Sequence, residues 1–176
     1  MARPYQPSLL RLLHIPTALL VTGLWLTGFV ILGIYDGRWF RLPAAFGSVD
    51  WIDVHGTLGV PLVLLATLFV PYALSVGRAR LKKAANLVPL LALVLSVGSG
   101  LLMQENLVRD GVTGGLAYGL HLTGWAVMGV AVLLHLAGVL GRGGWPLAVS
   151  MFRADLRPGD RPGDWPAQLR RHFRRG

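Results

Sequence analysis

The stretch that decides the fold lies at residues 118–141, which read YGLHLTGWAVMGVAVLLHLAGVLG. It contains no Asp, Glu, Lys or Arg, and its basic side chains are two histidines, His121 and His135. About 20 apolar residues are enough for a helix to cross the hydrocarbon core of a bilayer. Because no water is present there to satisfy free backbone groups, the stretch is predicted to be a membrane-spanning helix.

Three other stretches have the same apolar character, and the four spans are predicted at about residues 10–34, 54–76, 84–104 and 118–141. The composition agrees, because 53% of the 176 residues are hydrophobic and 14% are charged, against about a quarter charged in soluble domains. Short connections favour antiparallel neighbours. We therefore expect an all-α membrane protein, with an antiparallel four-helix transmembrane bundle over residues 1–141 and a basic juxtamembrane tail at residues 142–176.

Lys and Arg are distributed unevenly over the segments between the spans. Fourteen of the 17 lie in the N-terminal segment, in the loop between the second and third spans, and in the tail. The loops that follow the first and third spans carry the other three. Basic residues accumulate on the cytoplasmic side of a membrane protein, so both termini are predicted to be cytoplasmic.

The tail has its own composition and contains a short duplication. Arg157-Pro158-Gly159-Asp160 is followed directly by Arg161-Pro162-Gly163-Asp164. Two copies of four residues are too short for a repeat architecture. A polybasic segment directly after a membrane helix is typical of binding to anionic lipid. Membrane lipid is therefore an expected partner of the tail, and nucleic acid is not.

The chain has no Cys and five His. The absence of Cys excludes disulfides, thiolate metal sites and covalent c-type haem, so histidine is the main metal-binding side chain that remains. Four histidines fall inside the predicted spans. The predicted topology pairs them by depth, His55 with His121 near the outer side and His14 with His135 toward the cytoplasm. Ionisable side chains in a membrane usually face the protein interior or a functional group, although each one alone could be a satisfied core residue.

The spacing of the two histidines in the last span favours a cofactor. Fourteen residues place His121 and His135 within roughly 40° of each other on one helix face and about 21 Å apart along its axis. Two imidazoles that face each other can hold a haem iron between them. We therefore expect two bis-histidine haem b sites, stacked across the bilayer. The flanking charges imply an offset of about 6 Å in depth between His14 and His135, which helix tilt can absorb.

These residues resemble the bacterial di-haem cytochrome b561 family and, more broadly, the b-type cytochrome subunits of hydrogenases and formate dehydrogenases. Residues 11–18, RLLHIPTA, are similar to that family's Arg-x-x-His-Trp-x-x-Ala start, from which Ile15 and Pro16 depart. Residues 53–56, DVHG, open the second span, and the last span has the family's 14-residue histidine spacing. The resemblance implies that the axial ligands are His14 and His135 for a cytoplasmic-side haem b, and His55 and His121 for a periplasmic-side haem b.

The resemblance also implies a location and a function. The protein would lie in the bacterial inner membrane and transfer electrons there. Electrons would pass through the two haems from an external donor, either superoxide or a periplasmic or membrane redox partner, to the quinone pool. The protein would then be an electron-transfer cytochrome, or a quinone-linked oxidoreductase. Arg11 lies one turn before His14 and is expected either to contact a haem propionate, because guanidinium binds carboxylate well, or to reach lipid phosphates.

Two other interpretations of the intramembrane histidines stay open. The chain could be a cofactor-free membrane anchor or assembly subunit of a larger complex, in which the histidines are polar contacts between helices. It could also be a proton or metal transporter, although transporters usually have intramembrane carboxylates or broken helices. The small residues of the third span, Ser96 to Gly100, are interpreted as close helix packing only.

Overall fold

The computed structural model describes residues 4–103 and 108–174, except for the side chains of Ala44 and of residues 171–174. The predicted end of the third span at Gln104, the charge of Glu105 and the final Arg175 therefore lie outside the described residues. Over the described ranges the regular elements are helices and no strand is present. Four helices are long and apolar enough to cross a membrane, which confirms the all-α membrane fold.

The four long helices are α1 (Ser8–Ile31), α2 (Trp51–Leu74), α3 (Ala84–Leu101) and α4 (Leu116–Val149). α1 continues into a π-helical turn, Leu32–Asp36, and ends at Gly37. The φ of Gly37 is +63°, a left-handed conformation that glycine adopts without a side-chain penalty. At the start of α2, the Asp50 carboxylate accepts hydrogen bonds from two backbone amides, as expected for an N-cap.

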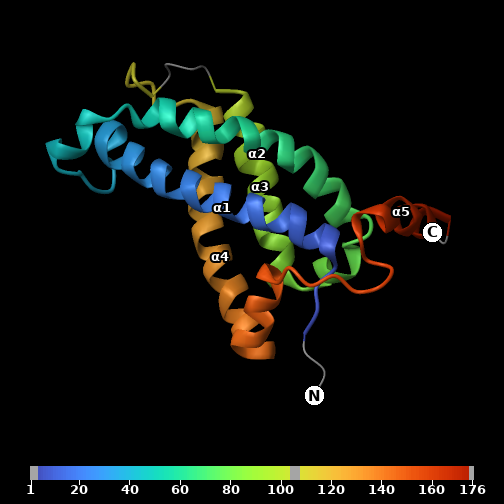
Figure 1. Ribbon diagram of the computed structural model, residues 1–176. Helices are drawn as coiled ribbons and strands as arrows, with labels where there is room; N and C mark the ends of the chain where they lie inside the picture. Colours follow the sequence, from blue (N-terminus) through green and yellow to red (C-terminus); the bar gives the residue numbers. More distant parts are fainter. Residues whose placement is uncertain (1–3, 104–107, 175–176) are drawn as a thin grey trace.

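The long helices form two hairpins. α1 packs along α2 and α3 packs along α4, and the two hairpins cross each other obliquely (Figure 1). Where they cross, a buried cluster formed by Leu62 of α2, Ala92 and Leu93 of α3, and Met128 of α4 joins them. α2 and α3 contact each other much less than the two helices within each hairpin do. The bundle is thus held together near its middle and leaves space between the hairpins.

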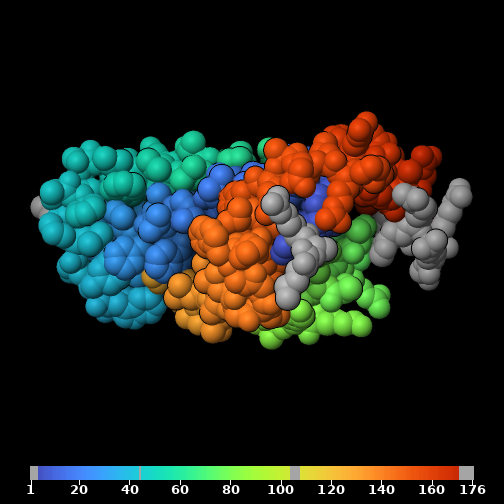
Figure 2. Space-filling model, turned by 60° about the horizontal axis from the view of Figure 1, so that its bottom comes forward, coloured from blue at the N-terminus to red at the C-terminus, as the bar shows by residue number. Residues whose placement is uncertain are grey.

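The two ends of the bundle differ in character. One end, which we call the basic end, holds the start of α1 and the segment after α2 with Arg78, Arg80 and Lys82. Leu10 and Leu13 of α1 pack there against Tyr72 of α2 and Met151. The segments around Ser8 and Asp160 are hydrogen-bonded to each other there, so the N-terminal and C-terminal segments lie at the same end. Figure 2 shows this end, with the orange-red C-terminal segment beside the start of α1. Which side of the membrane it faces stays a prediction.

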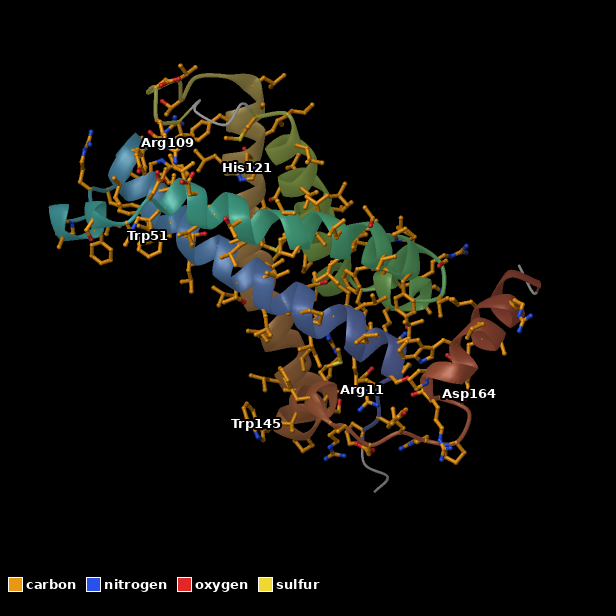
Figure 3. All side chains as sticks on the ribbon, turned by 45° about the horizontal axis from the view of Figure 1, so that its top comes forward. Arg11, Trp51, Arg109, His121, Trp145 and Asp164 are labelled. Carbon is orange, nitrogen blue, oxygen red and sulfur yellow. The ribbon has the colours of Figure 1, made fainter. Side chains whose placement is uncertain are left out.

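The opposite end, which we call the acidic end, is formed by the loop between α1 and α2 and by the segment between α3 and α4. Tyr118 donates a hydrogen bond to Asp36 at 2.6 Å, and Arg38 donates one to the backbone oxygen of Thr113 at 3.0 Å. Figure 3 shows Arg109, Trp51 and His121 near this end, far from Arg11. Because the end of α1 meets the start of α4 here, and the start of α1 meets the end of α4 at the basic end, these two helices run antiparallel.

α4 is longer than the predicted span. It continues past Gly141 and Arg142 to Val149, with a break in its geometry at Gly144, whose φ is +59° and ψ −162°. Glycine permits this kink, and the chain resumes a helical path beyond it. The tail then forms a short helix, α5 (Trp165–Arg174). Arg142 therefore lies within the helix, and a charged residue did not mark its end.

Candidate functional site

The first pair of intramembrane histidines lies near the acidic end. His55 comes from the second turn of α2 and His121 from the second turn of α4. Their ring centres are 6.0 Å apart and their planes are inclined by 79°. The structure thus brings together the two residues that the topology paired at the outer level.

Hydrogen bonds orient both rings of this outer pair. Nδ1 of His55 lies 2.7 Å from Oγ1 of Thr27, whose hydroxyl donates to the backbone oxygen of Leu24. Nδ1 of His121 lies 2.9 Å from the backbone oxygen of Ser96. Because a carbonyl oxygen only accepts, Nδ1 of His121 carries the proton, and the Thr27 contact favours the same tautomer for His55. This leaves the Nε2 lone pairs available for a metal.

A cavity of about 610 Å³ adjoins the outer pair. It lies within the range of about 300–1,000 Å³ that is usual for ligand and cofactor sites. Its walls come from all four long helices and are mostly apolar. A Cβ added at Gly56 or Gly59, both on the α2 wall, would meet no atom within 4 Å. The divergence of the two hairpins therefore leaves room for a large planar ligand beside His55 and His121.

The second pair, which we call the inner pair, lies nearer the basic end. The ring centres of His14 on α1 and His135 on α4 are 6.2 Å apart, and their planes are inclined by 32°. Nδ1 of His135 lies 3.0 Å from the backbone oxygen of Ala85 on α3. His14 contacts the edge of Phe69 on α2, with ring centres 6.1 Å apart. The two rings lie close together, although the flanking charges had implied an offset in depth.

The separation within each pair fits a bis-histidine haem. Two imidazoles that bind one metal ion from opposite sides, each through a nitrogen about 2 Å away, have ring centres roughly 6 Å apart. The observed values are 6.0 and 6.2 Å. Two protein nitrogens suffice for iron in a porphyrin, because the macrocycle provides the other four ligands. The donor set and its spacing thus fit haem b at both levels.

Two tryptophans lie along the helices between the two histidine pairs. The rings of Trp25 on α1 and Trp125 on α4 stack with centres 5.2 Å apart and planes inclined by 8°. Each indole nitrogen donates to the backbone oxygen of the other residue, at 3.2 Å from Trp25 and 2.9 Å from Trp125. Both residues also line the cavity. These contacts between Trp25 and Trp125 join the two hairpins at the side of the outer site that faces the second histidine pair.

Arg11 is buried against the C-terminal segment. Arg11 is 5% exposed. Its guanidinium donates to the backbone oxygens of Arg153 and Asp155, the latter at 2.8 Å. It also stands over the ring of Tyr5, 5.2 Å from the ring centre. The contact with a propionate stays a prediction, while the structure shows Arg11 bound to the C-terminal segment.

The contribution of α3 was not expected from the sequence. The small residues of this span suggested packing only, yet the Ser96 backbone oxygen and the Ser99 hydroxyl both contact His121, at 2.9 and 3.3 Å. A Cβ on Gly100 would lie 3.2 Å from Cε1 of the same ring. Ala85 contacts His135 in the same way. The depth of Ser96 and Gly100, matched to that of His121, was the signal that could have revealed this.

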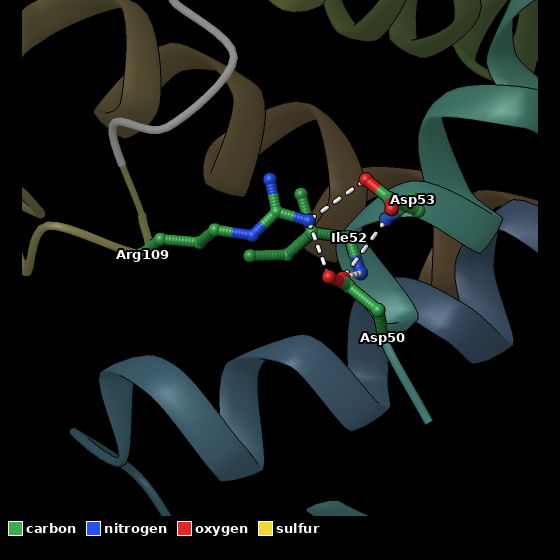
Figure 4. A network of polar contacts seen from close by, with 4 residues as sticks. All are labelled: Asp50, Ile52, Asp53 and Arg109. Carbon is green, nitrogen blue, oxygen red and sulfur yellow. Dashed lines mark hydrogen bonds and ion pairs between the residues drawn. The ribbon is translucent and has the colours of Figure 1, made fainter. Parts of the chain in front are cut away.

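An ion-pair network lies at the acidic end. Arg109 binds Asp50 at 2.6 Å and Asp53 at 2.7 Å (Figure 4). A hydrogen bond from the Asp53 backbone amide, together with the Arg109 guanidinium, holds the pKa of Asp50 below its usual value. Because Asp53 also lines the cavity, this network links the segment between α3 and α4 to the edge of the outer site.

Comparison with known proteins gives one finding. The family model described as prokaryotic cytochrome b561 matches residues 5–154, a range that contains both histidine pairs and all four long helices. Comparisons with curated proteins and with solved structures gave no match.

Proposed function

The chain belongs to the prokaryotic cytochrome b561 family, and from this premise we propose that it holds two haem b groups, one at each histidine pair. Membership of the family implies haem b and electron transfer across the membrane. The observation that carries the proposal is the pair of ring separations, 6.2 and 6.0 Å, at two levels of one bundle. His14 and His135 bind the group near the basic end, and His55 and His121 bind the group near the acidic end.

The histidines and their partners have a simple task in this proposal. Haem b, when bound, provides an iron that takes up and releases single electrons. With two histidines at each level, the residues would hold the haem iron through two imidazoles, and such a site would serve electron transfer and not catalysis at the metal. The Thr27, Ser96 and Ala85 oxygens fix the ring orientations and make the imidazoles stronger donors.

The surroundings of the outer site support the same function. The walls of the cavity beside His55 are mostly apolar and include Leu93 and Met128. Burial of this kind and hydrogen bonds to the ligands are the means by which a protein sets a redox potential. The paired indoles of Trp25 and Trp125 hold that wall rigid.

The finer assignments rest on the charge distribution and on the family resemblance. With basic residues in the cytoplasm, the basic end and both termini face the cytoplasm and the acidic end faces the periplasm of the bacterial inner membrane. An external donor, superoxide or a redox partner protein, then gives electrons at the acidic end. Quinone in the membrane accepts them.

Proteoliposomes test this proposal. Haem-loaded protein is reconstituted with ferricyanide trapped inside and ascorbate outside, and the ferricyanide colour is followed. The wild type is expected to bleach the ferricyanide, and His14→Ala is expected to stop the bleaching while one haem can still be reduced from outside. A soluble ubiquinone analogue should reoxidise the reduced wild type. Full haem content with no transfer in the wild type would refute the proposal, and absence of haem would favour the cofactor-free anchor.

A further inference from the structure

The C-terminal segment folds back over the first turn of α1. The Asp160 carboxylate accepts a hydrogen bond from the backbone amide of Ser8 at 2.8 Å, and the Ser8 hydroxyl donates to the Asp160 backbone oxygen at 2.6 Å. Trp165 donates to the same hydroxyl at 2.8 Å. The residue before α1 is Pro7, which has no side-chain cap. Asp160, 152 positions further along the chain, thus supplies the N-cap that the local sequence lacks.

A second set of contacts holds the same turn. The buried guanidinium of Arg11 donates to the backbone oxygens of Arg153 and Asp155. Tyr5 donates to Asp160, and two guanidinium groups stand over its ring, with Arg11 5.2 Å and Arg157 4.1 Å from the ring centre. Asp160 itself is 8% exposed. The C-terminal segment therefore binds both the backbone and the side chains of the first turn of α1.

His14 follows Arg11 by one helical turn. The other three intramembrane histidines each have a hydrogen bond at Nδ1, to Thr27, Ser96 or Ala85. In the described part of the chain, the ring of His14 makes aromatic contacts with Phe69 and His135 instead. Its position therefore depends on the position of the helix start that carries it.

We propose that Asp160 and Arg11 are positioning residues for His14, which fix the first turn of α1 and thereby the geometry of the inner site. The inference rests on the proposed function in one respect, the role of His14 as a ligand. It also assigns a structural role to a part of the tail that has no role in the proposed electron transfer. Neither residue touches the inner histidine pair, so both act through the helix.

The duplicated Arg-Pro-Gly-Asp sequence provides a matched control. Asp160 ends the first copy and docks on α1, whereas Asp164 ends the second copy and accepts from the backbone amide of Arg161 at 2.9 Å, within its own turn. The two residues have the same type and the same preceding sequence. Asp160→Ala and Asp164→Ala therefore separate docking on α1 from a general effect of the tail.

Hydrogen exchange tests the anchoring without any haem. In Asp160→Ala, the peptide that covers residues 8–14 is expected to exchange about five- to tenfold faster, as for a helix that loses its cap. Asp164→Ala is expected to match the wild type, and Asp160→Asn, which keeps an oxygen for the Ser8 amide, is expected to restore most of the protection. Equal exchange in Asp160→Ala and Asp164→Ala would overturn the proposal.

Electron paramagnetic resonance of the oxidised protein tests the consequence for the inner site. Asp160→Ala is expected to shift or broaden the low-spin signal that is lost in His135→Ala, and to leave the signal that is lost in His55→Ala unchanged. The unchanged signal also reports that the bundle is folded. If Asp160→Ala yields no folded protein, Ser8→Ala, which loses the hydroxyl that donates to the Asp160 backbone oxygen and accepts from Trp165, is measured in the same way.

The two arms keep failure of this proposal apart from failure of the proposed function. Protein that binds no haem refutes the di-haem function, and the exchange of residues 8–14 in that protein still decides whether Asp160 anchors α1. Faster exchange together with an unchanged inner signal would overturn the positioning role. Equal shifts of both haem signals would overturn it as well, because the effect would then not act through His14.

Discussion

The two histidine pairs have nearly the same ring separation but are built in different ways. In the outer pair, residues of neighbouring helices orient both rings, with Thr27 at His55 and Ser96 at His121. In the inner pair, Ala85 orients His135 in the same manner, while His14 depends on a helix start held by the C-terminal segment. The ring planes differ accordingly, with 79° between the outer rings and 32° between the inner rings.

The two pairs thus reach nearly the same ring separation, although the contacts that position their rings span very different distances along the sequence. The outer site is assembled from facing helices within the membrane. The inner site also needs residues more than 140 positions apart, as in the contact between Arg11 and Asp155. We therefore expect perturbation of the bundle interior to affect the outer site and perturbation of the tail to affect the inner site.

Removal of one ligand from each pair should have the largest effect. His55→Ala and His135→Ala are each expected to lose one haem, about half of the haem per chain, because a bis-histidine iron loses one of its two protein ligands. Pyridine haemochrome analysis and low-spin resonance signals measure the loss. The double variant should lose both haems. If the two single variants lost the same signal, the assignment of the pairs would be wrong.

Removal of the hydroxyl that orients His55 should have the next largest effect. Thr27→Val keeps the shape of the side chain but removes the oxygen next to Nδ1, and loss of such a partner typically weakens metal binding about 10- to 100-fold. Haem retention at the outer site during dilution measures this. Thr22→Val is the matched control, because its hydroxyl donates only within α1, to Ala18. Comparable haem loss from both variants would argue against a role for Thr27.

A smaller change is expected from the glycine beside His121. In Gly100→Ala, the new methyl would lie 3.2 Å from Cε1 of the ring, so the imidazole must move by a few tenths of an ångström. We expect a shift in the resonance signal of the outer site with haem content preserved. Gly98→Ala should give no shift, since its Cβ meets nothing within 4 Å. A shift of the inner signal alone in Gly100→Ala would contradict the assignment of α3 to the outer site.

The smallest effect is expected from the ion pairs at the acidic end. Arg109→Gln removes exposed ion pairs, which contribute little, so the Tm in detergent should fall by roughly 1–2 °C at pH 7. The pKa of Asp50 is lowered in the folded protein, so its contribution is complete above the usual value of 3.8 and is lost as the pH falls through the folded pKa. Wild type and variant should therefore converge only below about pH 4. A difference that stayed constant down to pH 3 would show that Asp50 is not involved.

The sequence predicted the features that depend on apolar length, charge distribution and helical spacing. The four helices follow from uninterrupted apolar stretches such as residues 118–141. The spacing of His121 and His135, combined with the expected topology, paired His55 with His121 and His14 with His135, and the structure places the rings of each pair next to each other. These inferences need only the rise of a helix and the alternation of spans.

Other features could not be obtained in this way. The docking of Asp160 on Ser8 joins residues that no periodicity connects, and the stacking of Trp25 on Trp125 depends on how the hairpins cross. The end of the last helix was also missed, because α4 continues past Arg142 to Val149. Such contacts are set by tertiary packing, which a pattern within one segment does not contain.

The central claim is that this b561-family chain holds one haem b at each of two histidine pairs, and a haem count on the wild type tests it most directly. Pyridine haemochrome analysis of purified protein, made with ample haem supply and quantified by amino-acid analysis, is the measurement. The account predicts two haem b per chain. A value of one, or no haem at all, would contradict it.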